Sequence, residues 1–566
     1  MSDLTTRPWL TQYAPGVPWD IEPTDDTLCD LLDDAVARFS DRAALDFYGK
    51  ATTYGELSLA VARAAGALRD LGVERGDRVA LVLPNCPQHV VAFYAVLRLG
   101  AIVVEHNPLY TTDELATQFA DHGARIAIAW DKTVPALTEV AESTDLGTIL
   151  AVNLTRALPL GKRFALRLPV AKARHTRTAM TAKAPGTPSW DATVARATPI
   201  ASDHPRPSAD DIAALQYTGG TTGVPKGAML THRNLRANAA QGRAWVPGLA
   251  DGEEVIYALL PLFHAYGLTL CLTFAISIGA TLVLFPRFEA QQALEAMKRR
   301  PATFLPGVPP MYQALADAAL ESGADLRSVR FAISGAMSLP TTIVDHWEAV
   351  TGGLLVEGYG MTETSPVSVG NPIAPTRRPG TIGVPFPSTY VRIVDPLDPE
   401  TDSEPGDPGE LMVKGPQVFT GYWNRPEDTA EVLSADGWLR TGDIVTMDDD
   451  GFITVIDRIK ELIITGGFNV YPSQVEDALR RVPGVVDAAA VGLPDGSGGE
   501  RVVAAIVVGP GLKLDPEQVR AATRAHLTGY KVPRQVFVVD ELPRSMIGKV
   551  LHRVVRDRLL HHPDQR

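Results

Sequence analysis

Short apolar runs alternate with amphipathic stretches along about the first 370 residues of the chain. Residues 78–84 (RVALVLP) have the length and composition of a buried strand, residues 87–100 (PQHVVAFYAVLRLG) those of a helix, and residues 101–108 (AIVVEHNP) those of a further strand. Strand-like runs return at residues 302–307, 328–335 and 353–360. Strands that alternate with helices form parallel sheets covered by helices. The pattern therefore predicts an α/β protein.

The pattern changes after about residue 380. Residues 380–457 hold short strand-like runs between Pro and Gly turns, which predicts a small β-barrel or sandwich. From Arg458 onward, helical and strand-like runs form a compact α+β piece with a core of its own. We therefore expect a large domain at residues 1–457 and a small α+β domain at residues 458–566.

Residues 267–285 (GLTLCLTFAISIGATLVLF) are uncharged and about as long as a transmembrane helix. Gly279 and the β-branched residues that follow it divide the stretch into a helix and a strand. We expect both to be buried in the protein core, as in a doubly wound sheet, and not in a bilayer.

Composition narrows the class of protein. The chain has 566 residues, too many for one compact core, and its 45% hydrophobic and 21% charged content is ordinary for a soluble α/β protein. A net charge of −13 argues against a nucleic-acid-binding face, which is basic. The three cysteines share no metal spacing and the first residues lack a secretory signal pattern, so we expect a cytoplasmic protein.

One stretch reverses the acidic character of the chain. Residues 146–190 contain no Asp or Glu, and apolar residues are interleaved with basic ones. A solvated excursion is one interpretation. The other, stated as a hypothesis, is that residues 156–183 contact an anionic membrane, which would make the protein peripheral on the inner face of the cell membrane. The basic residues are Arg156, Lys162, Arg163, Arg167, Lys172, Arg174, Arg177 and Lys183.

Residues 217–227 (YTGGTTGVPKG) combine glycines with hydroxyl and ammonium groups. Glycines let backbone amides approach phosphate oxygens, and the threonine and lysine side chains add donors. The lysine does not follow a glycine directly, so this is not a Walker loop. Flanking apolar runs predict a loop between two strands, with the next helix capped at Thr231. The predicted phosphate-binding residues are Thr218, Gly219, Gly220, Thr221, Thr222, Gly223 and Lys226.

A second glycine-rich run, residues 357–363 (EGYGMTE), also suits a nucleotide. Tyr359 can stack on adenine, Thr362 can hold a phosphate oxygen, and Glu363 offers a hard oxygen ligand for Mg²⁺ carried by ATP. Small residues at the end of residues 331–337 (FAISGAM) would leave room beside a nucleotide. The nucleotide-binding residues predicted here are Gly335, Ala336, Glu357, Gly358, Tyr359, Gly360 and Thr362, with Glu363 as the metal ligand.

Three further polar residues belong to the candidate set. The carboxylate of Asp443 can accept hydrogen bonds from both ribose hydroxyls, and Arg458 can add a donor to the same sugar. His264 lies where an uncharged stretch meets the nucleotide loops. Its predicted role is to orient the substrate carboxylate or the approaching thiol.

These runs, with residues 457–472 (DRIKELIITGGFNVYP) and 542–553 (LPRSMIGKVLHR), resemble the adenylate-forming enzymes, which are acyl-CoA synthetases, peptide-synthetase adenylation domains and luciferases. The resemblance spans roughly residues 26–558. It is strongest to bacterial long-chain fatty-acid–CoA ligases, through residues 107–115 (NPLYTTDEL), 415–427 (GPQVFTGYWNRPE) and 527–533 (LTGYKVP). It implies two α/β subdomains with parallel sheets and a small β-barrel, followed by a small, mobile α+β domain.

The resemblance also implies a reaction in two steps that uses ATP, Mg²⁺ and CoA. A fatty acid attacks the α-phosphate of ATP to give acyl-AMP and pyrophosphate, and the CoA thiol then takes the acyl group and releases AMP. Two anions must meet in the first step, so positive charge from Lys549 and Lys226 should stabilise the transition state. The implied catalytic residues are Lys549, His264, Thr218 and Glu363.

In the family the small domain rotates between the two steps, about a hinge that falls on Lys460. Gly466, Gly467 and Asn469 are then implied to line the CoA path. Leu268 stands where some long-chain members have a tryptophan gate, which puts that gating device in doubt here. The residues expected at the acyl tunnel, in and near residues 304–312, are Tyr266, Leu268, Val308, Met311 and Gly335. The expected partners are a fatty acid and, as a hypothesis, a second copy of the chain, with no nucleic acid.

Other functions share these motifs. A medium-chain or aryl-carboxylate CoA ligase has the same nucleotide runs, and so does a ligase that loads acyl-AMP onto a carrier protein. A catalytically silent lipid-binding scaffold is an alternative of another class, but it would not need Lys549, Glu363, Asp443 and Lys226 together. Nothing in the sequence favours luciferase-like oxidation.

Overall fold

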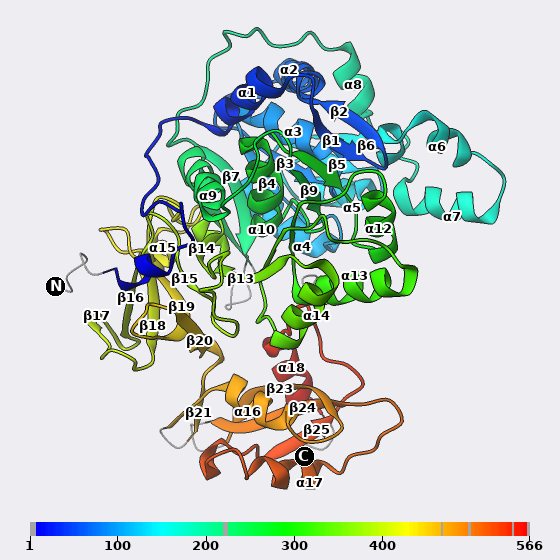
Figure 1. Ribbon diagram of the computed structural model, residues 1–566. Coiled ribbons are helices and arrows are strands. Elements are labelled where there is room, and N and C mark those ends of the chain that lie inside the picture. Colours follow the sequence, from blue (N-terminus) through cyan, green and yellow to red (C-terminus); the bar gives the residue numbers. More distant parts are fainter. Residues whose placement is uncertain (1–6, 219–224, 466–467, 496–499, 546–547, 563–566) are drawn as a thin grey trace. The chain divides into compact units, whose positions relative to one another are not determined.

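The computed structural model of the chain describes residues 7–218, 225–465, 468–495, 500–545 and 548–562 (Figure 1). They form two compact units. The larger unit lies within Trp9–Tyr390 and Val413–Leu439, and the other consists of the described residues among 7–8, 391–412 and 440–562. The predicted domain boundary at residues 457/458 and the hinge at Lys460, which lies in the short helix η5 (Ile459–Glu461), stay predictions.

The larger unit contains two sheets, the first with six strands in the order β6-β5-β3-β4-β7-β8. The pairs β6–β5, β5–β3, β3–β4 and β4–β7 are parallel, and β8 pairs with β7 in the antiparallel direction. The parallel strands confirm the α/β prediction. The strands are β3 (Arg78–Val82), β4 (Ile102–Glu105), β5 (Ile126–Trp130), β6 (Thr148–Val152), β7 (Ile212–Thr218) and β8 (Lys226–Thr231).

The second sheet has nine strands in the order β15-β14-β13-β12-β11-β9-β10-β1-β2. Its centre, from β13 to β1, is parallel, whereas the edges at β14, β15 and β2 are antiparallel. The strands are β1 (Ala43–Phe47), β2 (Lys50–Thr53), β9 (Val255–Ala258), β10 (Thr281–Leu284), β11 (Phe304–Gly307), β12 (Phe331–Ser334), β13 (Leu354–Gly360), β14 (Val367–Gly370) and β15 (Val384–Pro385).

Most helices of the larger unit cover its sheets with their apolar faces. Four of them have a threonine at the N-cap, whose side chain accepts a hydrogen bond from the backbone amide of the third helical residue. The side chain of that third residue in turn accepts a hydrogen bond from the threonine backbone amide. The four threonines are Thr27, Thr53, Thr111 and Thr231. The cap at Thr231 was predicted and is confirmed. The helices of eight or more residues are α1 (Leu28–Phe39), α2 (Tyr54–Asp70), α3 (Pro87–Arg98), α4 (Thr112–His122), α5 (Val134–Ala141), α7 (Ala171–Met180), α9 (His232–Trp245), α12 (Ala290–Met297), α13 (Pro309–Ser322) and α14 (Thr341–Thr351). The shorter ones are α6 (Leu160–Ala165), α8 (Trp190–Arg196), α10 (Ala265–Gly267), α11 (Phe274–Ser277) and α15 (Pro426–Val432).

The long uncharged stretch at residues 267–285 is core, as predicted. It forms the end of α10, the π-helix η3 (Leu268–Thr273), α11 and then strand β10, which lies between β9 and β1 in the nine-stranded sheet. In the part of the chain that the structure describes, no helix has both the length and the apolarity to cross a membrane. Cys29, Cys86 and Cys271 are all buried and free.

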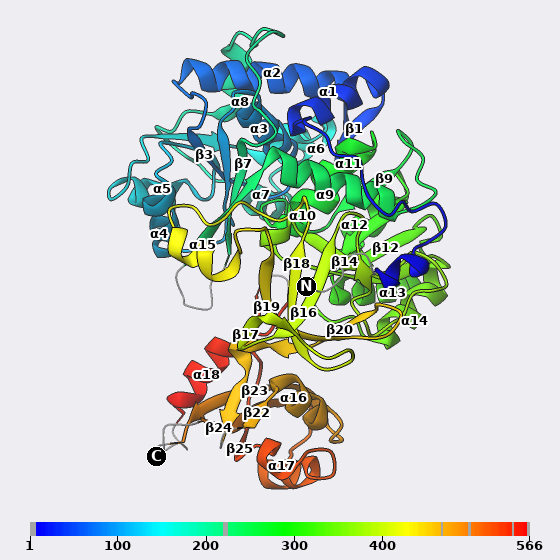
Figure 2. The same ribbon diagram turned by 90° about the vertical axis from the view of Figure 1, so that its left-hand side faces the viewer.

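Residues predicted as a small barrel form a five-stranded sheet in the order β17-β16-β18-β19-β20. Its strands are β16 (Tyr390–Asp395), β17 (Asp398–Asp402), β18 (Gly409–Lys414), β19 (Leu439–Met447) and β20 (Ile453–Arg458). The predicted α+β piece follows, with a three-stranded sheet in the order β23-β24-β25 and a β21–β22 pair. Its elements are β21 (Ile463–Thr465), β22 (Phe468–Val470), α16 (Pro472–Arg480), β23 (Val485–Pro494), β24 (Glu500–Val508), α17 (Pro516–Thr523), β25 (Gln535–Val538) and α18 (His552–Leu560) (Figure 2).

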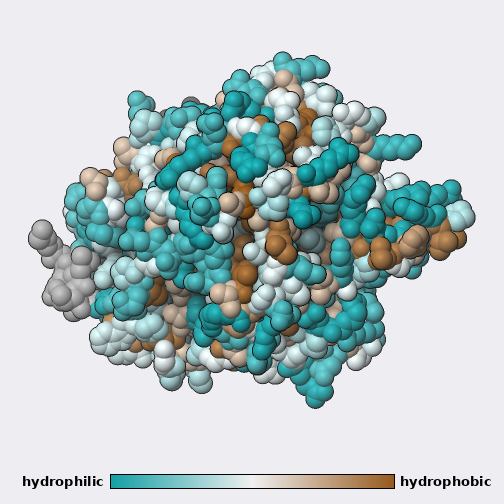
Figure 3. All heavy atoms as spheres, turned by 90° about the horizontal axis from the view of Figure 1, so that it is seen from above, coloured by the Kyte–Doolittle hydropathy of each residue, from teal (hydrophilic) through white to brown (hydrophobic). Residues whose placement is uncertain are grey.

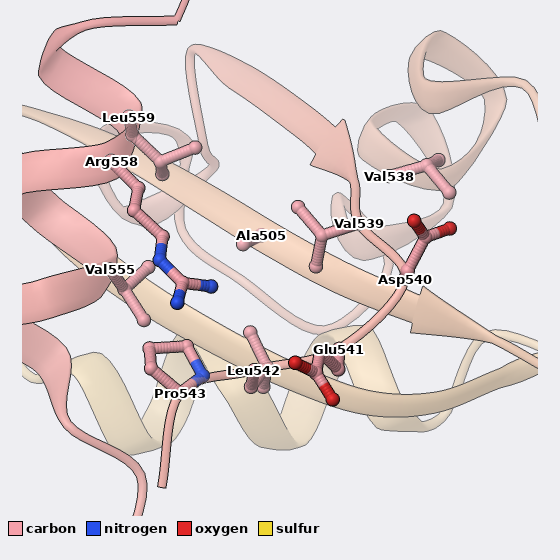
Figure 4. Close-up of a pocket in the computed structure, with 10 residues that line it drawn as sticks. All are labelled: Ala505, Val538, Val539, Asp540, Glu541, Leu542, Pro543, Val555, Arg558 and Leu559. Atoms are coloured by element: carbon pink, nitrogen blue, oxygen red, sulfur yellow. The ribbon is translucent and has the colours of Figure 1, made fainter.

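This α+β piece has apolar cores on both sides of its sheet. One core is built around α16 and α17 and the other around α18. A hollow of about 500 Å³ lies between α18 and the segment after β25, where Arg558 extends between the helix and the strands (Figure 4). Asp540 and Glu541 lie on the segment that borders this hollow.

Candidate active site

The predicted phosphate loop connects two paired strands, as expected. Thr218 ends β7 and lies opposite Lys226, the first residue of β8. The threonine hydroxyl donates to the Lys226 carbonyl oxygen at 3.5 Å. Antiparallel pairing brings these two residues together at the end of the hairpin from which the loop leaves. The remaining predicted loop residues, Gly219, Gly220, Thr221, Thr222 and Gly223, lie outside the described residues.

Lys226 belongs to a chain of polar contacts that ends at the predicted metal ligand. Its ammonium forms an ion pair with Asp428 on α15 and lies 5.2 Å from the ring centroid of Tyr422. The Tyr422 hydroxyl donates to Glu363 Oε1 at 2.7 Å. Burial raises the pKa of that hydroxyl, and the neighbouring carboxylate of Glu363 raises it further. The fold thus joins Lys226 and Glu363 through Tyr422.

Tyr422 and Asp428 were not among the predicted site residues. Tyr422 lies within residues 415–427, a run that supported the family resemblance without being given a role. Asp428 follows directly after that run. Because Asp428 neutralises Lys226 in this structure, a phosphate group that binds Lys226 must compete with a carboxylate.

The second predicted run lies at the end of β13 and in the following turn. Gly360 ends the strand, and a Cβ there would lie 1.7 Å from the carbonyl oxygen of Pro366, so only glycine fits. Tyr359 is half-buried beside it. Thr362 and Glu363 occupy the short helix η4 (Thr362–Thr364), and Glu363 is 6% exposed.

Strand β12 ends next to β13 and carries the other predicted small residues. Ser334 pairs with Glu357 across the two strands, and Gly335 follows directly. A Cβ on Gly335 would lie 3.0 Å from the ring of Tyr266, which explains the glycine. Ala336 is exposed and has a φ of 66°, in the left-handed region. The ends of parallel strands therefore bring residues 335–336 and 357–363 together, as in other α/β sites.

His264 caps α10 and is neutral at physiological pH. Its Nδ1 accepts a hydrogen bond from the backbone amide of Tyr266 at 3.2 Å. Burial lowers its pKa to about 4. The neutral ring therefore carries its proton on Nε2, which is the tautomer that can donate to a carboxylate or carbonyl oxygen. This favours an orienting role over one that supplies charge.

Glu357 should be protonated at neutral pH, because burial raises its pKa to about 8. The folded protein then binds this proton more tightly than the unfolded chain, so stability falls as the pH rises from about 4.5 through 8. Between pH 4.5 and 8 the free energy of unfolding should fall by about 4 kcal/mol because of Glu357, and we expect Glu357→Gln to abolish this fall. Urea unfolding at several pH values measures it, with the exposed Glu321→Gln as control. Equal pH dependence in both variants would contradict the prediction.

The other unit brings together three residues predicted from distant parts of the sequence. Asp443 is buried on β19 and forms an ion pair with Arg458 on β20, with 2.8 Å between Oδ1 and Nε. Lys549 lies within electrostatic reach of both. Burial lowers the pKa of its ammonium and Arg458 adds to this effect, while Glu461, Asp443 and Asp457 oppose it. The Lys549 backbone is held by Ser545, whose amide donates to its carbonyl oxygen at 2.7 Å.

The predicted CoA path is described only in part. Gly466 and Gly467 lie outside the described residues, and Asn469 is placed on strand β22. A hollow of about 670 Å³ lies beside Thr465, with Arg520, Arg524 and Arg534 among the residues around it.

The residues predicted for the acyl tunnel gather at one end of β11 and β12. The hydroxyl of Tyr266 donates to the carbonyl oxygens of Gly307 and Ile333, at 3.2 and 2.7 Å. Val308 caps α13, and Met311 lies in its first turn. Leu268 is fully buried and begins the π-helix η3. A π-helix is rare and often marks a functional site.

A small closed cavity beside η3 was not predicted. Its free volume is about 10 Å³. It lies beside Gly242 on α9, where a Cβ would be 3.4 Å from the ring of Phe274. Its lining side chains are apolar and belong to Trp245, Val246, Leu270, Phe274, Phe304, Ile333, Val367 and Phe386. Ile333 joins it to Tyr266, since its carbonyl oxygen accepts the tyrosine hydroxyl.

The donor set suits a metal ion that arrives with ATP. Among the described residues, no group of three or more His, Cys, Asp or Glu side chains is placed to hold a metal. Mg²⁺ needs few protein ligands, because water and phosphate oxygens fill the rest of its coordination shell. The buried carboxylate of Glu363 fits as a single protein ligand of that kind.

Family models match most of the chain. The AMP-binding enzyme model matches residues 32–423, and the model of the AMP-binding enzyme C-terminal domain matches residues 474–549. The first match covers every strand of the six-stranded and nine-stranded sheets, and it ends at Trp423, directly after Tyr422.

Curated and solved relatives agree with the models. The chain is 39% identical to a long-chain-fatty-acid–CoA ligase of Bacillus subtilis, over 97% of each chain. It is 37% identical to a feruloyl-CoA synthase of Amycolatopsis sp, over 92% of this chain and 97% of that one. The crystal structure of ATP-bound MatB from Rhodopseudomonas palustris matches with a TM-score of 0.81 and 30% identity, over 94% of this chain and 99% of that one. The chain therefore belongs to the AMP-binding enzyme family and is an ATP-dependent, AMP-forming acyl-CoA synthetase that uses ATP, Mg²⁺ and CoA.

Proposed function

We propose that the acid activated by this synthetase is a long-chain fatty acid. The observation that carries the proposal is the near full-length identity, 36–39%, to several long-chain-fatty-acid–CoA ligases. The buried apolar side chains of Leu268 and Val308 among the expected tunnel residues support it, because a long hydrocarbon chain needs contacts with apolar side chains and few polar ones.

In the proposed first step, the fatty carboxylate attacks the α-phosphate of ATP and pyrophosphate leaves. Thr218 and Lys226 hold phosphate oxygens, and Glu363 supplies the protein ligand of Mg²⁺. His264 Nε2–H orients the carboxylate. Lys549 adds positive charge where negative charge develops, which lowers the barrier of the step. Asp443 and Arg458 hold the ribose of the same nucleotide.

In the proposed second step, the CoA thiol attacks the acyl carbonyl and AMP leaves. Rotation about Lys460 withdraws Lys549 and brings Gly466, Gly467 and Asn469 to the pantetheine arm. The thiol sulfur forms a bond to the acyl carbon, the bond from that carbon to the AMP oxygen breaks, and the thiol proton is released to water.

The acyl chain is proposed to enter beside Tyr266, Val308 and Met311 and to extend past Leu270 toward the small cavity at Gly242. A free volume of about 10 Å³ is far too small for a hydrocarbon tail. Side chains on η3 and α11 must therefore move when a long chain binds, and the wide turns of the π-helix favour such repacking.

Filling this cavity should discriminate between chain lengths. We expect Gly242→Phe to reduce kcat/KM for palmitate about tenfold or more. The change for octanoate should be less than threefold, which corresponds to about 0.7 kcal/mol. Gly242→Ala is the matched control, because a single Cβ makes only ordinary contacts there. Equal losses for both acids would place the tail elsewhere.

A substrate panel tests the proposed function. Pyrophosphate release and CoA-thioester mass are measured with palmitate, octanoate and 4-coumarate. The proposal expects the highest kcat/KM with palmitate, and a preference for either other acid would overturn it.

The specific alternative is an aryl-carboxylate ligase, because a feruloyl-CoA synthase is a relative at 37% identity. 4-Coumarate would then be the best acid of the panel. Transfer to a carrier protein is distinguished by the thioester readout, since such a ligase forms acyl-AMP without forming acyl-CoA.

The predicted cytoplasmic location, the second copy of the chain and the membrane contact of residues 156–183 also remain proposals. A long-chain substrate partitions into bilayers, so an enzyme that touches the inner face of the membrane would meet it at high local concentration.

A further inference from the structure

The helices α6 and α7 form a projection at the side of the larger unit (Figure 1). Between the buried residues Leu158 and Met180, no residue is buried. Large apolar side chains are nevertheless frequent there: Leu160 is 68% exposed, Phe164 64%, Leu168 53% and Val170 51%. Seen from above, apolar residues form a patch along the edge of the molecule, bordered by hydrophilic ones (Figure 3).

The projection is attached at both ends, so its exposure is not the fraying of a loose segment. The Lys162 ammonium donates to the Tyr48 carbonyl oxygen at 3.0 Å and lies over the ring of the same tyrosine. At the far end, the Trp130 indole donates to the carbonyl oxygen of Met180 at 2.9 Å. Arg177 joins the two helices by donating to the Leu166 carbonyl oxygen at 3.2 Å.

The attachment orients α6. Leu160 and Phe164 are four residues apart and share one face of the helix. Lys162, two residues from each, faces the turn between β1 and β2. The apolar face is therefore directed away from the body of the unit. Burying Leu160 and Phe164 against the body would release water from apolar surface, so leaving them exposed lowers stability unless another surface covers them.

The charge of the projection identifies that surface. Residues 146–190 contain no acidic residue, although the chain as a whole carries −13. The exposed cations alternate with the apolar side chains, and Arg167 lies 5.6 Å from the ring centroid of Phe164. Basic and apolar side chains on one face match a surface that has anionic groups above a hydrocarbon layer. An acidic protein or a nucleic acid would match the cations alone.

We propose that α6 and α7 dock the enzyme on an anionic lipid bilayer. Leu160, Phe164, Leu168 and Val170 enter the headgroup boundary, and Arg163, Arg167, Lys172 and Arg174 contact lipid phosphates. The purpose of this contact, which is to take a long-chain acid from the bilayer, rests on the proposed function. The contact itself requires no turnover.

Sedimentation of the full chain with vesicles, without ATP, tests the docking separately from the substrate. Phosphatidylcholine vesicles are compared with vesicles that contain 30% phosphatidylglycerol, at low salt, where attraction between opposite charges is strongest. We expect the wild type to bind the anionic vesicles at least tenfold more tightly. Arg163→Gln/Arg167→Gln and Leu160→Ser/Phe164→Ser should each weaken that binding at least fivefold.

Matched controls use residues of similar exposure elsewhere on the same unit. Leu59 on α2 and Lys298 after α12 are exposed, and Leu59→Ser and Lys298→Gln should bind vesicles as the wild type does. Activity with octanoate in detergent-free buffer verifies that every variant is folded.

Two results would overturn the proposal. One is equal sedimentation of the wild type and both double variants. The other is binding of soluble polyglutamate that is lost in Arg163→Gln/Arg167→Gln while vesicle binding is unchanged, because the surface would then recognise an acidic chain. A protein that prefers 4-coumarate but still binds anionic vesicles would refute the proposed substrate and leave the docking surface in place.

Discussion

Replacing Lys549 by alanine should slow acyl-AMP formation at least a hundredfold, which corresponds to about 2.7 kcal/mol of transition-state stabilisation. The ammonium is the positive charge proposed to act where the fatty carboxylate meets the α-phosphate. The conversion of supplied acyl-AMP and CoA to acyl-CoA should be nearly unchanged, because we propose that Lys549 is withdrawn in that step. Single-turnover measurements of the two half-reactions separate these effects.

Arg553→Ala is the matched control, since it removes a positive charge from an exposed position four residues away. It should leave both half-reactions intact. Burial and the neighbouring Arg458 lower the pKa of Lys549. As the pH rises, acyl-AMP formation should therefore decline at a lower pH than it would if Lys549 had the pKa of an ordinary lysine. Equal losses in the two half-reactions of Lys549→Ala would refute the role assigned to it.

Replacing Glu363 by glutamine should lower kcat/KM for ATP in acyl-AMP formation at least a hundredfold, again about 2.7 kcal/mol. The amide keeps the size of the side chain and can still accept from the Tyr422 hydroxyl, but it lacks the charge that Mg²⁺ favours. Activity should consequently need a higher Mg²⁺ concentration to saturate. Initial rates over a Mg²⁺ titration measure both effects.

Tyr422→Phe separates the proposed metal contact of Glu363 from the hydrogen bond that positions its carboxylate. It removes the 2.7 Å hydrogen bond to Glu363 and retains the ring beside Lys226. We expect about a tenfold loss, without a large shift in the Mg²⁺ dependence. If Glu363→Gln left the Mg²⁺ dependence unchanged, Glu363 would be a structural partner of Tyr422 and not a metal ligand.

The regular elements could be predicted because local pattern and tertiary environment agree. The run at residues 78–108 gave β3, α3 and β4 as expected, and the threonine at residue 231 caps α9 through a purely local hydrogen bond. Family motifs are equally local, which is why Lys226, Glu363, Asp443 and Lys549 could be proposed as site residues without coordinates. Their roles still await the variants described above.

Contacts between distant residues could not be predicted in this way. Tyr422 links Lys226 to Glu363 only because β8 and η4 lie beside the turn that carries it. The ion pair between Asp443 and Arg458 depends on the register of β19 against β20. The cavity at Gly242 depends on how η3 packs against α9.

The sequence by itself determined the α/β class, the family and the types of groups available for adenylate chemistry, because period, capping and short motifs are properties of neighbouring residues. The tertiary structure alone decided which of these groups are buried, which carboxylate pairs with which cation, and which apolar side chains of α6 remain uncovered. Burial and pairing set pKa values and desolvation costs, and both depend on residues that are far apart in the chain.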